Sequence, residues 1–130
     1  MQSRDKIILQ KICSEIGLIL KFIGEKNLEE FLKDELTKHA VGMTLINIGE
    51  FTKHLSDDLI KNYSEVDWKK VAEFGDIVAY KYELPNMTDV YNTITKNFPE
   101  MKNQIEKILE LDPEKKLGLS NQEFPLIPNS

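Results

Sequence analysis

Residues 68–82, WKKVAEFGDIVAYKY, have the apolar spacing of a helix but two unsuitable residues at its centre. Asp67 precedes the stretch and is a good helix N-cap. Gly75 costs about 1 kcal/mol relative to alanine in a helix interior, and a charged Asp76 follows it. The remaining side chains predict a helix that is buried over most of its circumference, because apolar residues recur on nearly every face: Trp68, Val71, Ala72, Phe74, Ile77, Val78, Ala79 and Tyr82.

A polar strip interrupts this helix. Lys69, Glu73, Asp76 and Tyr80 follow one another at steps of four, three and four residues, so they share one face. Two interpretations are open. In one, the helix packs into its own bundle and against a second subunit. In the other, Asp76 and Tyr80 hydrogen-bond to each other, four residues apart, in a polar seam.

The rest of the chain also has helical periodicity. We expect a helix over residues 5–23 that stops at Gly24, and a capping box at Asn27. The next segments predict a break near Asp34, a short helix after Ser56, and a last long helix from Asn86. Pro99 should kink that last helix or restart it at Asn97, and Leu84-Pro85 should end the helix before it. Gly42 and Gly49 lie on one face of the second long helix and predict a close helix–helix approach.

These elements predict an all-α fold, an antiparallel bundle of four to five helices that forms dimers. Residues 1–111 make the bundle, and residues 112–130, with three prolines and no periodicity, are expected to be a flexible C-terminal tail.

The composition of the chain argues against several classes of ligand and site. The net charge of −5 and the single arginine, Arg4, argue against binding to duplex DNA or to an anionic membrane, because phosphate contacts need a basic face. Cys13 lies among apolar residues and is expected to be a core thiol. His39 and His54 are fifteen residues apart and lack a ligand motif, so we expect no metal and no cofactor. Without a transmembrane run, the protein is expected in the cytoplasm.

Three segments together resemble the HepT-like proteins of the HEPN superfamily over about residues 4–110. The first, at 28–50, ends in Ile48, Gly49 and Glu50, which is similar to the "IGE" of the family. The second, VDWKKVAEFGDIVAYKY at 66–82, is similar to a family segment that contains Arg-Asn, three further residues, His and, two positions on, Tyr. The third, at 91–109, resembles the closing helix of the family, with its proline after an apolar residue.

The resemblance implies a homodimer whose paired motifs line a cleft, and a minimal nucleotidyltransferase as antitoxin partner. Many members are metal-independent ribonucleases, in which the arginine would hold the phosphate and the histidine would transfer protons. The final tyrosine, here Tyr82, is the position that the partner enzyme modifies in some members.

This chain departs from the motif where catalysis needs it. Gly75 stands at the arginine position, Asp76 at the asparagine position and Tyr80 at the histidine position. Tyrosine, with an ordinary pKa of about 10, is a poor proton shuttle at neutral pH. We therefore expect ribonuclease activity to be lost or weakened. Two alternatives stay open: an active nuclease that uses Lys81, Tyr80 and Glu50 with RNA as substrate, and a non-catalytic scaffold or substrate-presenting subunit.

Overall fold

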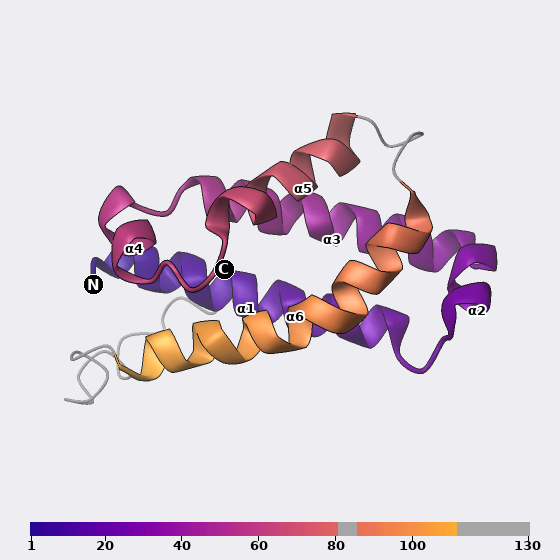
Figure 1. Cartoon of the computed structure of the whole chain (residues 1–130), viewed down its shortest axis with the longest axis horizontal. Helices are drawn as coiled ribbons and strands as arrows, with labels where there is room; N and C mark the ends of the chain where they lie inside the picture. The colour runs from indigo at the N-terminus through magenta and orange to yellow at the C-terminus, as the bar shows by residue number, and fades with distance from the viewer. Residues whose placement is uncertain (81–85, 112–130) are drawn as a thin grey trace.

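The computed structural model describes residues 1–80 and 86–111, and this part of the chain is all-helical (Figure 1). It consists of four long helices, α1 (Ser3–Ile23), α3 (Glu35–Lys53), α5 (Trp68–Tyr80) and α6 (Met87–Glu110). Two short helices, α2 (Leu28–Lys33) and α4 (Asp57–Asn62), lie between the first three of them. The predicted all-α bundle is confirmed. None of the described helices combines the length and the apolar character that a membrane crossing requires.

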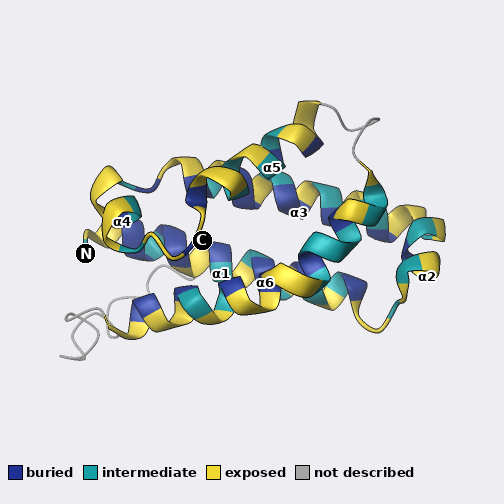
Figure 2. Ribbon diagram, viewed as in Figure 1, coloured by how far each residue is buried: buried dark blue, intermediate teal, exposed yellow. Residues whose placement is uncertain are grey.

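Helix α1 lies at the centre of the bundle. It packs against α3 on one side and against α6 on the other, while α5 packs on α3. A stripe of isoleucines at helical spacing on α1 is buried, since every member of it is at most 8% exposed: Ile8, Ile12, Ile16, Ile19 and Ile23. The buried faces of the long helices turn toward one another (Figure 2). Full burial of such a side chain contributes about 1.5–3 kcal/mol, so this stripe is a main source of stability.

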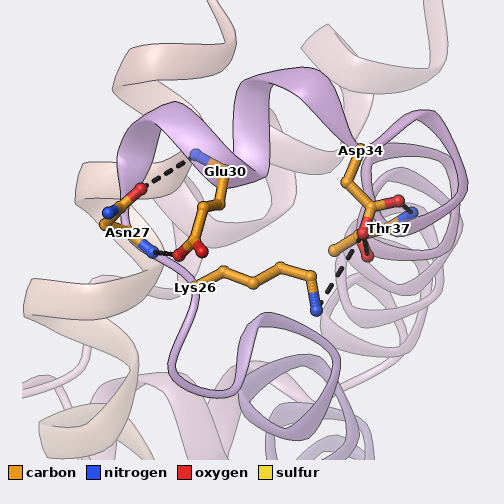
Figure 3. A network of polar contacts seen from close by, with 5 residues as sticks. All are labelled: Lys26, Asn27, Glu30, Asp34 and Thr37. Atoms are coloured by element: carbon orange, nitrogen blue, oxygen red, sulfur yellow. Dashed lines mark hydrogen bonds and ion pairs between the residues drawn. The ribbon is translucent and has the colours of Figure 1, made fainter.

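Side-chain caps divide the segment between α1 and α3 where the sequence predicts. Asn27 and Glu30 form the reciprocal capping box of α2, with both N···O distances 2.9 Å (Figure 3). Asp34 then ends α2 and caps α3: its carboxylate accepts from the backbone N–H of Thr37 at 3.0 Å and from the Thr37 hydroxyl at 2.8 Å. These bonds, first that from the backbone N–H, lower the pKa of Asp34.

The later caps and stops are also as predicted. Ser56 caps α4, Asp67 accepts from the N–H of Lys70 in the first turn of α5, and Asn86 caps α6. Gly24 ends α1 with a positive φ of 54°. The expected stop at Leu84-Pro85 and the expected tail at 112–130 lie outside the described residues.

Helix α6 differs from one of its two predicted forms. It runs without interruption from Met87 to Glu110 with Pro99 inside it, so the prediction of a restart at Asn97 is wrong. Its axis bends part way along (Figure 1), as expected of a proline that removes one backbone hydrogen bond. Apolar residues on both sides of Pro99, including Phe98 and Met101, are buried against the bundle, and this packing favours a single bent helix.

A buried carboxylate near the start of α1 binds the residue that precedes α4. Asp5, only 3% exposed, accepts from the backbone N–H of Ser56 at 2.9 Å and from its hydroxyl at 2.6 Å. Ser56 in turn caps α4.

Cys13, on the same helix as Asp5, is half-buried, and burial raises its pKa to about 11.

Candidate functional site

Gly75 is not an open position on the surface of α5 but the point where α5 touches α3. A Cβ atom at Gly75 would lie 3.0 Å from the Cα of Gly49 and 3.0 Å from the carbonyl oxygen of Leu45, both backbone atoms. The close approach predicted at Gly49 is thereby confirmed, and Gly75 is its partner. At Gly42 the same test gives an ordinary 3.8 Å contact with Val78, so only one of the two predicted glycines is tightly packed.

The residue that the family resemblance places at the motif arginine is therefore packed against the backbone of α3. Any side chain at 75 would first require α3 and α5 to separate by a few tenths of an ångström. Gly75 offers no side-chain donor, and its surroundings leave no room for one to be introduced without that movement.

Asp76, the next residue, also reaches α3, where it takes part in an ion-pair cluster. Its Oδ1 lies 2.6 Å from the Nζ of Lys53 on α3, and the same Nζ lies 2.9 Å from the Oε2 of Glu50. The pKa of Lys53 is raised, first by the hydrogen bond to Asp76 and next by that to Glu50. The structure thus pairs Asp76 with Lys53 and not with Tyr80, so the interpretation of an Asp76–Tyr80 hydrogen bond is wrong.

Tyr80, which the family resemblance places at the motif histidine, is 80% exposed at the end of α5. It lies four residues from Asp76, on the same face of the helix. The structure therefore brings Asp76 and Glu50 together through Lys53, with Tyr80 one turn away. Lys81 and Tyr82, the remaining predicted site residues, lie outside the described residues.

Lys53 is the site residue that sequence reasoning missed. Its spacing to Glu50, three residues on one helix, was visible as an i,i+3 pair. Its contact with Asp76 spans 23 residues and depends on how α5 crosses α3, which no local pattern reports.

An apolar groove of about 680 Å³ runs along another side of α5, between it and α6. Phe74, Ile77, Phe98 and Met101 contribute its apolar surface, and Ile77 is 46% exposed. Acidic side chains lie along it with one lysine: Glu65, Asp67, Glu73, Glu100 and Lys70. This groove therefore lacks the basic lining that RNA phosphates need.

Nothing in the described ranges, 1–80 and 86–111, groups three or more metal-ligating side chains. His39 bonds through Nδ1 to the backbone oxygen of Glu35 at 2.8 Å, and His54 is exposed at the end of α3.

Comparison with known proteins places this sequence in a family. The sequence matches the description "Ribonuclease HepT-like" over residues 12–108. A probable ribonuclease HepT of Thermococcus cleftensis is 30% identical over 108 residues, which cover 83% of this chain and 98% of that protein. A candidate RNase of Methanocaldococcus jannaschii is 32% identical over 111 residues, which cover 85% of this chain and 96% of that protein.

A candidate RNase of Caldanaerobacter subterraneus is 29% identical over 102 residues, or 78% of this chain and 91% of that protein. No solved structure matches the chain. The family match spans well over half of the 130 residues, and the helical bundle agrees with it. The chain belongs to the ribonuclease HepT-like family of the HEPN superfamily.

Proposed function

We propose that this chain is a HepT-like subunit that has kept the fold of its family but has lost, or greatly weakened, the cleavage of RNA. The observation that carries the proposal is Gly75, at the position where the family has its arginine. Glycine has no side chain that could hold a phosphate, and its close packing against Gly49 and Leu45 leaves no room for one.

The neighbouring residues support the same conclusion. Asp76 brings a carboxylate to the motif, and Lys53, the cation beside it, is shared between Asp76 and Glu50. One ammonium between two carboxylates leaves one net negative charge, which repels a phosphodiester. Tyr80 is exposed to solvent, where a phenol with an ordinary pKa of about 10 is a weak general base at neutral pH.

We further propose that the protein works in the cytoplasm as a homodimer and as partner of a minimal nucleotidyltransferase, in the arrangement of toxin and antitoxin that the family suggests. Helix α5 offers surface for such contacts, because Ile77 is 46% exposed and Phe74 is half-buried beside the α5–α6 groove. Tyr82 is the candidate for modification by the partner.

Incubation of the purified protein with total RNA in EDTA tests the loss of activity. We expect no cleavage, while a HepT-like protein that retains the motif arginine and histidine should cut the same RNA. Cleavage that disappears in a Tyr80→Phe variant would reject the proposal and favour the divergent nuclease.

Sedimentation and mass spectrometry test the assembly. At micromolar concentration we expect a dimer, and a monomer would contradict the shared cleft. After co-expression with a nucleotidyltransferase encoded beside this chain, we expect nucleotide mass on Tyr82 that is absent from Tyr82→Phe. An unmodified Tyr82 beside an active partner enzyme would remove it as the acceptor.

A further inference from the structure

We propose that Lys53 is the phosphate-facing cation of the surface between α3 and α5, and that Asp76 and Glu50 keep it from single-stranded RNA. In this proposal the surface is an anion site that the protein closes with its own carboxylates. The inference deepens the proposed function and rests on it, because it explains why the motif surface of this chain does not engage RNA.

The first step of the argument is position. Gly75 provides no donor, but Lys53 reaches across from α3 and places its Nζ 2.6 Å from Asp76, the residue that follows Gly75. A cation is therefore present beside the motif, although it comes from a different helix. Lysine can bind a phosphate as a point charge without the forked geometry of arginine.

The second step is accessibility. The side chains of Lys53 and Asp76 are 37% and 39% exposed, and that of Glu50 is 55% exposed, so a ligand in solution can reach all three. Ion pairs at this level of exposure are weak individually, and another anion can compete for the lysine. An ammonium has three N–H donors, of which the two carboxylates occupy two.

The third step is charge. With both carboxylates ionised the cluster carries one net negative charge, and with both replaced by amides it carries one net positive charge. A change of two units at a single phosphate-sized site reverses the sign of its interaction with RNA. Asparagine, the family residue at position 76, would already remove one of the two negative charges.

The fourth step identifies single-stranded RNA as the ligand class. Tyr80 lies one turn along α5 from Asp76 and is 80% exposed, so its ring can accept an unpaired base beside a phosphate held at Lys53. Stacking on aromatic rings next to a cation is the usual way in which proteins hold single strands. A duplex would leave this exposed ring unused.

The test is the affinity of a fluorescein-labelled oligouridine for wild type and for Glu50→Gln/Asp76→Asn, measured by fluorescence anisotropy in EDTA. At about 0.1 M salt the Debye length is about 10 Å, so remote charges contribute little. For a phosphate about 6 Å away, Coulomb's law in screened water gives roughly a two- to threefold gain per carboxylate removed. The double variant should therefore bind about four- to tenfold more tightly than wild type.

Three further variants make the result specific. Adding Lys53→Met to the double variant should leave the affinity only about two- to threefold above that of wild type, because the net charge of the cluster then differs from wild type by one unit, and adding Tyr80→Leu should weaken binding severalfold through the loss of stacking. Glu29→Gln/Glu106→Gln is the matched control. It removes the same two charges and releases Lys33 and Lys102 from their ion pairs, yet it should change affinity by less than about twofold.

The inference is overturned if the double variant binds no more tightly than wild type, if Lys53→Met leaves the gain intact, or if the matched control gains equally. Asp76→Asn alone, expected to gain about two- to threefold, serves if the double variant does not fold. These outcomes are separate from the proposed loss of activity, which depends only on cleavage by the wild-type protein.

Discussion

Replacing Gly75 by alanine tests whether the α3–α5 contact is as close as the structure indicates. Alanine would gain about 1 kcal/mol from its higher helix propensity. Against this, its Cβ would lie 3.0 Å from two backbone atoms, Gly49 Cα and Leu45 O, which cannot rotate away as a flexible side chain could. Overpacking of this kind costs about 1–3 kcal/mol. We therefore expect Gly75→Ala to lower the free energy of unfolding by up to about 2 kcal/mol.

Gly42→Ala is the matched control, because Gly42 also lies on the α5-facing side of α3. Its new Cβ would meet only Val78 Cγ1, at 3.8 Å, which is ordinary van der Waals contact. This variant should gain about 0.5–1 kcal/mol, since it receives the propensity benefit without the overpacking. The difference between the two variants is then roughly 2 kcal/mol, or about 8 °C in Tm for a domain of this size.

Urea unfolding followed by far-UV circular dichroism measures both values. Protein concentration must be the same for all variants, because the apparent stability of a protein that dimerises would depend on it. The reasoning is refuted if Gly75→Ala is as stable as Gly42→Ala. A gain of stability over wild type in Gly75→Ala would show that α3 and α5 can separate at little cost, and that an arginine could be accommodated there.

Three other predictions follow from the described contacts. Ser56→Ala should destabilise the protein by about 1–3 kcal/mol, because it removes the cap of α4 and a hydrogen bond to buried Asp5; unfolding in urea checks this, and no change would show that the Asp5–Ser56 contact is dispensable. Cys13, with its pKa raised to about 11, should react with iodoacetamide at pH 8 roughly a hundredfold more slowly than a small free thiol, and equal rates would contradict its burial. Because the folded-state pKa of Asp34 is lowered, its stabilising effect is present above the unfolded value and is lost as pH falls through the folded value; Tm measured from pH 5 to pH 2 should fall less steeply in Asp34→Asn than in wild type.

The starts of the helices in this fold could be predicted from the sequence. The predicted caps at Asn27, Ser56 and Asn86 each stand one residue before the helix that they start, and in each of them the side chain accepts from a backbone N–H. Asp34, where the sequence predicts a break, caps α3 in the same way. Such signals act over three or four residues, so they can be recognised without knowledge of the tertiary structure. The isoleucine stripe of α1 is equally local, because its spacing alone selects the buried face.

The site was less predictable because it depends on contacts between helices. The sequence marked Gly75 and Asp76 as unusual, but not that Gly75 meets Gly49 or that Asp76 meets Lys53. Both contacts are set by the crossing of α3 and α5. At Pro99 a local pattern was misleading instead. Proline favours a break in the helix, but apolar packing on both sides of it keeps α6 continuous.

The arrangement of the long helices has a consequence for the motif-bearing helix. Among the described elements, α1 is held from two sides, whereas α5 packs mainly on α3, and the groove along α6 leaves its other flank without a partner in the monomer. We therefore expect α5 to open locally while the α1–α3–α6 layer stays intact, at less than the cost of global unfolding. Amide hydrogens of α5 should exchange with solvent sooner than those of α1, and any subunit that covers the groove should slow that exchange.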